Sequence, residues 1–172
     1  MTRPLAERIV AELTRRGEHL AVAESLTGGM LTAALVDVPG ASAVLVGGVV
    51  AYATPLKASV LYVDGALLAE RGAVDPQVAR QMAAGARERL VVDGRVAEHG
   101  VSTTGVAGPE SQDGHPPGTV WIGYSSQIAQ DDRGLLVVGD RAAVREAAVD
   151  GALELLADHL GIPHANPLEP RE

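Results

Sequence analysis

The apolar residues of this chain are almost all aliphatic, and this limits the kind of core that it can build. Hydrophobic residues make up 47% of the 172 residues, whereas aromatic residues make up 2%, with no Phe and a single Trp121. The interior must therefore be filled by Ala, Val and Leu, which suits a sheet covered by helices on both sides. A chain of this length is long enough for one domain with a sizeable core and short for two.

Apolar spacing and turn residues divide the chain into helices and strands. Leu5, Ile9 and Leu13 fall on one face of a first helix. Asp75 and Asp140 are typical N-cap residues. The pattern predicts helices over 5–16, 28–36, from Pro55, over 77–90 and over 140–160, and strands over 19–23, 43–52, 98–104, 119–125 and 135–138. The apolar strand at 43–52 is expected to be buried.

The order of these elements is neither a regular alternation of strand and helix nor a series of antiparallel strands. We therefore expect a three-layer α/β/α fold with a mixed, mostly parallel sheet of about five strands. Neither an internal repeat nor a linker interrupts residues 1–160, which we expect to form a single domain. Residues 161–172 contain three prolines and are expected to be a disordered tail.

Composition argues against several classes of partner. The net charge of −8 and the lack of a basic stripe with interleaved aromatics argue against nucleic acid. The chain has no Cys and no two His at metal-ligand spacing, so we expect neither a metal nor a cofactor. Without a signal peptide or a long apolar stretch, we expect a cytoplasmic protein with no membrane partner. We also expect a homo-oligomer.

Residues 24–29 read Glu-Ser-Leu-Thr-Gly-Gly and lie where a strand is expected to pass into a helix. Ser25 is a candidate nucleophile at this turn. The N–H groups of Gly28 and Gly29, at the start of a helix, could bind either a developing oxyanion or a phosphate. The same sequence is also typical of an ordinary capped turn.

A serine nucleophile needs a base, and Lys57 is the candidate. With Thr54 as N-cap and Pro55 as the first helical residue, Lys57 falls in the first turn of a helix. Burial or the positive end of the helix would favour its neutral form, which can activate a serine without a histidine. Taken alone, Lys57 also fits a solvated surface residue, and Tyr52 fits a strand residue with a solvated hydroxyl.

Seven short motifs occur in this chain in the same order as in the CinA C-terminal family, and the sequence resembles that family from about Leu5 to Leu160. The family includes stand-alone nicotinamide mononucleotide deamidases. The resemblance therefore implies a three-layer α/β/α fold and hydrolysis of nicotinamide mononucleotide to nicotinic acid mononucleotide and ammonia. An ordered set of motifs is far more specific than any one of them. The motifs begin at Glu24, Pro39, Gly48, Gly72, Gly105, Pro117 and Gly139.

The resemblance also implies roles for individual residues. Ser25 would attack the carboxamide carbon, Lys57 would take its proton and later pass one to the departing ammonia, and Tyr52 would be a supporting hydrogen-bond partner. Arg141 and Arg145 lie four residues apart, so both could face the phosphate of a nucleotide substrate, although this spacing also fits solvated helix charges. The expected substrate-binding residues are Thr27, Gly28, Gly29, Thr104, Gly105, Gly108, Arg141 and Arg145.

Two other functions stay open. Residues 110–113 read Glu-Ser-Gln-Asp where the family commonly has glycines. This difference favours, as the alternative, a domain that binds a nucleotide or a protein partner without turning it over. The third possibility is a hydrolase that acts on a different amide or ester through the same Ser25 and Lys57.

Overall fold

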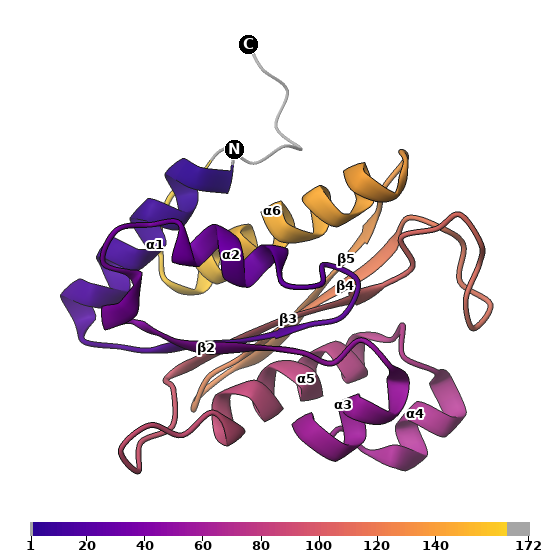
Figure 1. The fold of residues 1–172 in the computed structure, drawn as a ribbon, viewed down its shortest axis with the longest axis horizontal. Helices are drawn as coiled ribbons and strands as arrows, with labels where there is room; N and C mark the ends of the chain where they lie inside the picture. The colour runs from indigo at the N-terminus through magenta and orange to yellow at the C-terminus, as the bar shows by residue number, and fades with distance from the viewer. Residues whose placement is uncertain (1, 165–172) are drawn as a thin grey trace.

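Five strands form one mixed sheet in the computed structural model, which describes residues 2–164 (Figure 1). The order across the sheet is β2-β1-β3-β4-β5. β1 pairs in parallel with β2 and β3, whereas β4 pairs antiparallel with β3 and β5, so four of the five strands run in one direction. The strands are β1 (Leu20–Glu24), β2 (Leu45–Val50), β3 (His99–Gly105), β4 (Thr119–Ser125) and β5 (Gln130–Leu136).

Helices cover both faces of this sheet, which confirms the expected three-layer α/β/α fold. Figure 1 shows α1, α2 and α6 on one side of the sheet and α3, α4 and α5 on the other. Within the described residues, no helix combines the length and apolarity needed to cross a bilayer. The helices are α1 (Thr2–Arg16), α2 (Met30–Val36), α3 (Thr54–Leu61), α4 (Gly65–Arg71), α5 (Pro76–Arg89) and α6 (Arg141–His159).

The chain moves from one face of the sheet to the other after β2, the neighbour of β1. From β1 the chain passes through α2 on one face to β2, and from β2 it passes through α3, α4 and α5 on the other face to β3. The two connections leave the sheet on opposite faces and so open a crevice above the end of β1. Ligand sites of open α/β sheets form at such points. Ser25 follows β1 directly.

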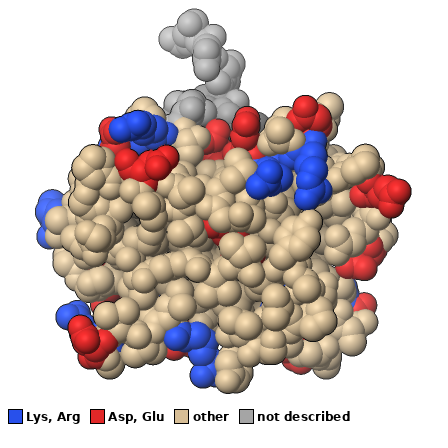
Figure 2. All heavy atoms as spheres, viewed as in Figure 1, with Lys and Arg blue, Asp and Glu red and all other residues tan. Residues whose placement is uncertain are grey.

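Two predicted strands differ from those observed, and both lie at sheet edges. The last strand, predicted over 135–138, runs from Gln130 to Leu136; its start was missed because residues 130–132 are polar and largely exposed. The strand predicted over 43–52 is shorter, spans Leu45–Val50 after a 3₁₀ turn at Ala41–Ala43, and is only half-buried because β2 is the other edge. Figure 2 shows the surface of the molecule in the orientation of Figure 1, with the charged side chains coloured.

Of the three N-caps predicted from the sequence, two are confirmed and one is wrong. Asp75 accepts hydrogen bonds from the backbone of Gln77 and Val78, and Asp140 accepts one from Ala143, as N-caps do. Thr54 is not an N-cap, since it is the first residue of α3 and Ala53 precedes the helix without a side-chain bond. The short α4 had not been predicted as a separate helix; Asp64 caps it.

The described part of the expected tail packs against the domain. The backbone N–H of Ile162 donates to the carbonyl of Ala157, and the Ile162 side chain is buried in the core. The imidazole of His164 contacts the carboxylate of Asp158 at 2.8 Å. Order therefore continues through residues 161–164, and the rest of the expected tail, 165–172, lies outside the described residues.

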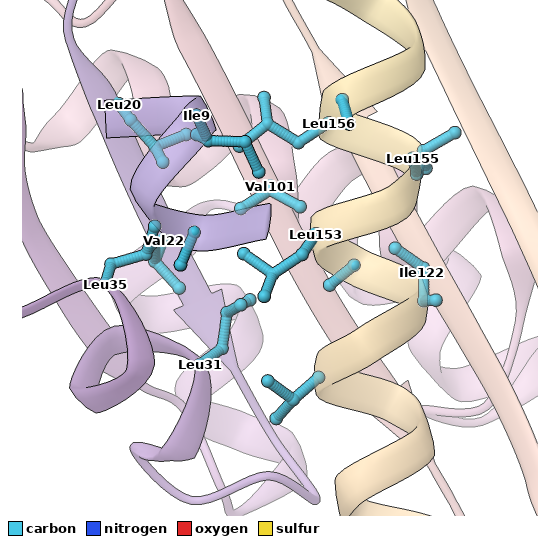
Figure 3. Packing of buried hydrophobic residues seen from close by; sticks show 14 of the residues in the cluster. Ile9, Leu20, Val22, Leu31, Leu35, Val101, Ile122, Leu153, Leu155 and Leu156 are labelled. Atoms are coloured by element: carbon cyan, nitrogen blue, oxygen red, sulfur yellow. The ribbon is translucent and has the colours of Figure 1, made fainter. Parts of the chain in front are cut away.

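Apolar side chains alternate along β1 and serve two separate cores. Leu20 and Val22 face the larger cluster beneath α1, α2 and α6, whereas Ala21 and Ala23 face the smaller one beneath α3 and α5. Figure 3 shows leucines of α6 reaching into the larger cluster toward the sheet. Tyr124 is the one aromatic residue in the two clusters of described residues, so the expected aliphatic core is confirmed.

Glycines let α5 lie directly on the sheet. A Cβ at Gly100 would stand 2.1 Å from the carbonyl oxygen of Ala83, and one at Gly123 would stand 2.2 Å from that of Ala79. Both obstructing atoms belong to the α5 backbone, which has no flexible end to move aside. The spacing between α5 and the sheet is therefore fixed by the absence of these two side chains.

We expect Gly123→Ala to lower the free energy of unfolding by about 2 kcal/mol, because the added methyl forces α5 away from β4. Urea unfolding monitored by circular dichroism measures this change. Gly65→Ala is the matched control, since Gly65 has no neighbour within 4 Å of an added Cβ and lies at an exposed helix start. Equal effects of the two substitutions would contradict this account of the packing.

Candidate active site

Ser25 and Lys57 meet at the carboxyl end of β1. Ser25 is the first residue after β1, and Lys57 lies in the first turn of α3 on the opposite side of the crevice. The Nζ of Lys57 donates to the Oγ of Ser25 at 3.0 Å. It also donates to the carbonyl oxygens of Ala51 at 2.9 Å and Tyr52 at 3.4 Å. A candidate nucleophile and a candidate base are therefore within hydrogen-bond reach.

Burial lowers the pKa of Lys57. The side chain is 1% exposed, and among the described residues no carboxylate forms an ion pair with it. Desolvation lowers the pKa of Lys57 from 10.5 to about 8. At pH 7 about one molecule in ten then carries a neutral amine, which is enough to serve as a base. The cause is burial, the first of the two effects considered from the sequence.

Glu24 holds the turn that carries Ser25, a role that the sequence analysis missed. Its buried carboxylate accepts hydrogen bonds from the backbone N–H groups of Gly29, Leu31 and Thr32, at 2.9, 3.1 and 2.8 Å. The hydroxyl of Thr32 donates to it as well, at 2.6 Å. A carboxylate at the amino end of α2 satisfies N–H groups that the helix leaves unpaired. The sequence did contain a sign of this role, since an acidic residue just before a glycine-rich helix start can cap that helix.

Arg145 and Thr27 anchor the same turn from the side of α6. The guanidinium of Arg145 donates through Nε to the carbonyl of Leu26 at 3.0 Å and through a terminal nitrogen to that of Thr27 at 2.8 Å. The hydroxyl of Thr27 is buried against that of Thr103, 2.7 Å away. These contacts are with the protein itself, so the two side chains position the turn and do not line the cleft beside Ser25.

The expectation that the backbone N–H groups of Gly28 and Gly29 could bind a ligand is wrong. The N–H of Gly28 donates to the carbonyl of Ser25, and that of Gly29 donates to Glu24, so neither is open to a ligand. Both glycines have positive φ, at 60° and 100°, a conformation that favours glycine. Within residues 2–164, the N–H groups of Leu26 and Thr27 have no hydrogen-bond partner. The donors available near Ser25 are therefore these two.

A cleft of about 140 Å³ opens beside Ser25 and Lys57. Arg141 lies at its wall, where it donates to the carbonyl of Gly108 at 2.9 Å and to the hydroxyl of Tyr52 at 3.1 Å. The Tyr52 hydroxyl thus contacts Arg141 instead of Ser25 or Lys57. The cleft is lined by Ser25, Leu26, Tyr52, Lys57, Ala73, Val74, Thr104, Gly105, Ala107, Gly108, Gln112 and Arg141.

The structure thus brings together most, but not all, of the predicted site residues. Thr104, Gly105, Gly108 and Arg141 line the cleft with Ser25. The other four, Thr27, Gly28, Gly29 and Arg145, do not line the cleft and instead form or hold the turn that carries Ser25. Gln112, which belongs to the segment 110–113 that differs from the family pattern but was not among the expected binding residues, reaches the cleft from the loop between β3 and β4. Within the described residues, no group of three or more His, Asp or Glu is placed to hold a metal ion.

We expect Glu24→Gln to lower the free energy of unfolding by about 2–4 kcal/mol. The amide nitrogen of glutamine would face backbone N–H groups that now donate to a carboxylate. Thermal and urea unfolding measure the change. Glu110→Gln, the same substitution at an exposed position, serves as the control and should leave stability unchanged. A loss of stability similar to that of Glu110→Gln would show that the Glu24 hydrogen bonds are unimportant.

The titration of Lys57 can be observed directly, because it is the only lysine of the chain. With lysine labelled selectively, we expect one side-chain NMR signal that titrates with a midpoint near pH 8. The unfolded chain binds more protons than the native one between pH 8 and 10.5. The unfolding free energy of the wild type, minus that of Lys57→Met, should therefore rise with pH across this window, by about 3 kcal/mol in total. A midpoint near 10.5 and a constant difference would refute the lowered pKa.

The chain is similar to known proteins in sequence and in structure. The family model for the CinA C-terminal domain matches residues 2–160. A CinA-like protein from Frankia casuarinae is 47% identical over 158 residues, which are 91% of this chain and 35% of that protein. One from Anaeromyxobacter sp. (strain K) is 46% identical over 153 residues, 88% of this chain and 36% of that protein. The chain thus spans about a third of the length of the curated relatives it matches.

Solved structures agree with these sequence matches. A competence-damaged protein (CinA) superfamily protein from Klebsiella pneumoniae 700603 aligns with a TM-score of 0.85 and 33% identity, covering 94% of this chain and 98% of that one. The competence/damage inducible protein CihA from Agrobacterium tumefaciens aligns with a TM-score of 0.85 and 34% identity, covering 93% and 95%. The chain therefore belongs to the CinA C-terminal domain family.

Proposed function

We propose that this domain hydrolyses the carboxamide of nicotinamide mononucleotide to nicotinic acid mononucleotide and ammonia. The observation that carries the proposal is the contact of 3.0 Å between Lys57 Nζ and Ser25 Oγ, with a lysine pKa lowered to about 8. A neutral amine at this distance accepts the hydroxyl proton as the oxygen attacks a carbonyl carbon. The resemblance to nucleotide deamidases supplies the substrate, and the cleft supplies a place for its ring.

The reaction proceeds through an acyl-enzyme in this proposal. Ser25 Oγ forms a bond to the carboxamide carbon while its proton passes to Lys57 Nζ, and the carbonyl oxygen becomes an oxyanion. The free N–H groups of Leu26 and Thr27 stabilise this oxyanion, because the residue after a nucleophile commonly supplies such a donor.

The tetrahedral intermediate then collapses. The bond between carbon and nitrogen breaks as Lys57 returns the proton to the leaving nitrogen, which departs as ammonia. Water gives a proton to the neutral Lys57 and adds to the acyl carbon, and the ester bond to Ser25 breaks with return of that proton to Oγ. The products are a carboxylic acid and the original enzyme, so atoms and protons balance.

Arg141 is assigned to the phosphate of the substrate. It is exposed at the cleft wall, and its contacts to Gly108 and Tyr52 involve a backbone carbonyl and a neutral hydroxyl, so its charge remains available to an anion. Tyr52 is assigned the role of holding this guanidinium, through the hydrogen bond of 3.1 Å. Arg145 is not assigned to the phosphate, because two of its nitrogens donate to the turn.

We expect the protein to release ammonia from nicotinamide mononucleotide, with Ser25→Ala and Lys57→Met each reducing the rate about 1,000-fold or more. Below pH 8, kcat/KM should rise about tenfold per pH unit and level off above it, because only the neutral Lys57 is active. Coupled ammonia assays measure both. No ammonia from the wild type at high enzyme concentration, or a pH profile that falls between pH 6 and 8, would refute the proposal.

The assignment of Arg141 to the substrate phosphate can be tested separately from catalysis. Arg141→Gln should raise KM for nicotinamide mononucleotide by about tenfold to a hundredfold and leave KM for the riboside, which lacks phosphate, unchanged. Arg8→Gln, at an exposed position of α1, should change neither. Equal effects of Arg141→Gln on the nucleotide and the riboside would show that Arg141 does not bind the phosphate.

The alternative of binding without turnover is favoured by one observation. Gln112 lines the cleft, and Asp113 beside it packs against Gly72 and Ala73, so this loop narrows the entrance with polar side chains. Calorimetry with nicotinamide mononucleotide separates the two functions. Affinity without ammonia release would support the binding module, and hydrolysis of another amide or of an ester, without turnover of nicotinamide mononucleotide, would support a different hydrolase.

A further inference from the structure

The cleft beside Ser25 holds two basic side chains and no acidic one. Lys57 and Arg141 line it, whereas none of the described residues that line it is Asp or Glu. Tyr52 connects the two bases, since its backbone carbonyl accepts from Lys57 at 3.4 Å and its hydroxyl accepts from Arg141 at 3.1 Å. A chain with a net charge of −8 therefore places two cations in one cleft, in contact with one tyrosine. Such a cleft attracts anions.

The carboxylates of the surrounding elements are engaged elsewhere. Lys57 is the only titratable residue of α3. Glu24, at the end of β1, accepts from the start of α2, and Asp75 caps α5. Asp113, from the loop between β3 and β4, accepts from the backbone N–H of Ala73. Over residues 2–164, no carboxylate forms an ion pair with either basic side chain of the cleft, so both lack a counterion within the chain.

The protonation state of Lys57 sets the direction of its hydrogen bond with Ser25. A protonated lysine has only N–H donors, so it donates to Oγ and leaves the hydroxyl hydrogen of Ser25 free to donate into the cleft. A neutral lysine has a lone pair and accepts from the same hydroxyl, which prepares the oxygen to attack. One contact of 3.0 Å thus presents a ligand with a hydrogen-bond donor in one state and a nucleophile in the other.

The protonated state suits a carboxylate better than a carboxamide. Besides the Ser25 hydroxyl, the N–H groups of Leu26 and Thr27 are without a hydrogen-bond partner in the described chain. The two oxygens of a carboxylate can accept from all three donors. A carboxylate also supplies the negative charge that the buried ammonium of Lys57 lacks, and burial leaves this attraction less screened than it would be in water.

The rest of the cleft restricts the class of ligand further. Apolar walls from Val74 and Ala107 provide a surface against which an aromatic ring can lie. Arg141 is exposed, and its present contacts are with a neutral hydroxyl and a backbone carbonyl, so a phosphate can pair with it. A molecule with a carboxylate on a ring and a phosphate farther along neutralises both cations of the cleft.

We propose that this cleft is also a binding site for phosphorylated aromatic carboxylates, which it holds while Lys57 is protonated. The carboxylate lies beside the Lys57 ammonium, and the phosphate pairs with Arg141. The identity of the ligand rests on the proposed function, because hydrolysis of nicotinamide mononucleotide yields such a compound, nicotinic acid mononucleotide. The product then inhibits the enzyme by occupying the protonation state that cannot hydrolyse the substrate.

Binding of the carboxylate is coupled to uptake of a proton. With a pKa of about 8, free Lys57 is already protonated in about nine molecules of ten at pH 7. Above pH 8 most molecules must gain a proton as the ligand binds, so the affinity falls about tenfold per pH unit. Hydrolysis has the opposite dependence, because it needs the neutral amine. A rise in pH therefore releases the product and activates the enzyme together.

Isothermal titration calorimetry of the full chain with nicotinic acid mononucleotide tests this site. We expect Kd to rise about thirtyfold between pH 7 and pH 9.5. Titrations at pH 9 in buffers of different ionisation enthalpy should show uptake of about 0.9 proton per ligand bound. Ribose 5-phosphate, which has the phosphate without the carboxylate, is the matched control and should bind without proton uptake and with the same Kd across this range.

The NMR signal of the single lysine provides a second readout, and it requires no substitution that could affect folding. Saturating nicotinic acid mononucleotide should move the titration midpoint of Lys57 from near pH 8 to above pH 9, because the bound carboxylate stabilises the ammonium. Lys57→Met should bind this ligand with a Kd that does not change with pH. Arg8→Gln, at an exposed position of α1, should behave as the wild type does.

Three results would overturn the inference: no binding of nicotinic acid mononucleotide, binding without proton uptake, or an unchanged lysine midpoint in the complex. The ammonia assay separates it from the proposed function. Proton-coupled binding by a protein that releases no ammonia would support the carboxylate site and refute the deamidase. Ammonia release by a protein without proton-coupled binding would support the deamidase and refute the carboxylate site.

Discussion

The burial of Lys57 against Ser25 is the interaction on which the rest of the site depends. The chain has 14 basic residues, and Lys57 is the only lysine among them. Arginine keeps its proton at any pH that a protein survives, whereas a buried lysine gives its proton up readily. Among the Lys and Arg side chains, the one that can become neutral near physiological pH is therefore also the one placed 3.0 Å from a serine hydroxyl. The proposed use of Lys57 as a base depends on this placement, because a lysine in a salt bridge would keep its proton.

The topology of the sheet explains why these two residues meet. Ser25 lies at the end of β1, and the connections that follow β1 and its neighbour β2 leave on opposite faces of the sheet, so the crevice forms beside this serine. Lys57 comes from the first helix on the other face, and Arg145 comes from α6 on the same face as α2. The turn that carries the serine is thus held by elements of both helical layers. Small shifts of either layer would alter the geometry of the pair.

The helix boundaries and the position of Lys57 could be predicted from the sequence, because they depend on residues that are close together in the chain. The helix caps at Asp75 and Asp140 and the position of Lys57 in a first turn follow from spacing alone. The roles of Glu24 and Arg145 did not follow, since both depend on contacts with backbone groups whose orientation is set by the folded turn. The exposure of β2 was missed for a related reason: an apolar strand looks the same in the sequence whether it ends up at the centre or at the edge of a sheet.

Glu24 and Lys57 show how the pKa of a buried lysine can be lowered although a buried carboxylate lies on the neighbouring residue of the same turn. The two side chains flank the same serine, and an ion pair between them would favour protonated lysine and raise its pKa. Four donors from the start of α2 occupy the Glu24 carboxylate, while backbone carbonyls accept from Lys57. With the carboxylate engaged elsewhere, desolvation alone acts on the lysine and lowers its pKa to about 8. The cap of α2 therefore supports the fold and also keeps the acid away from the base.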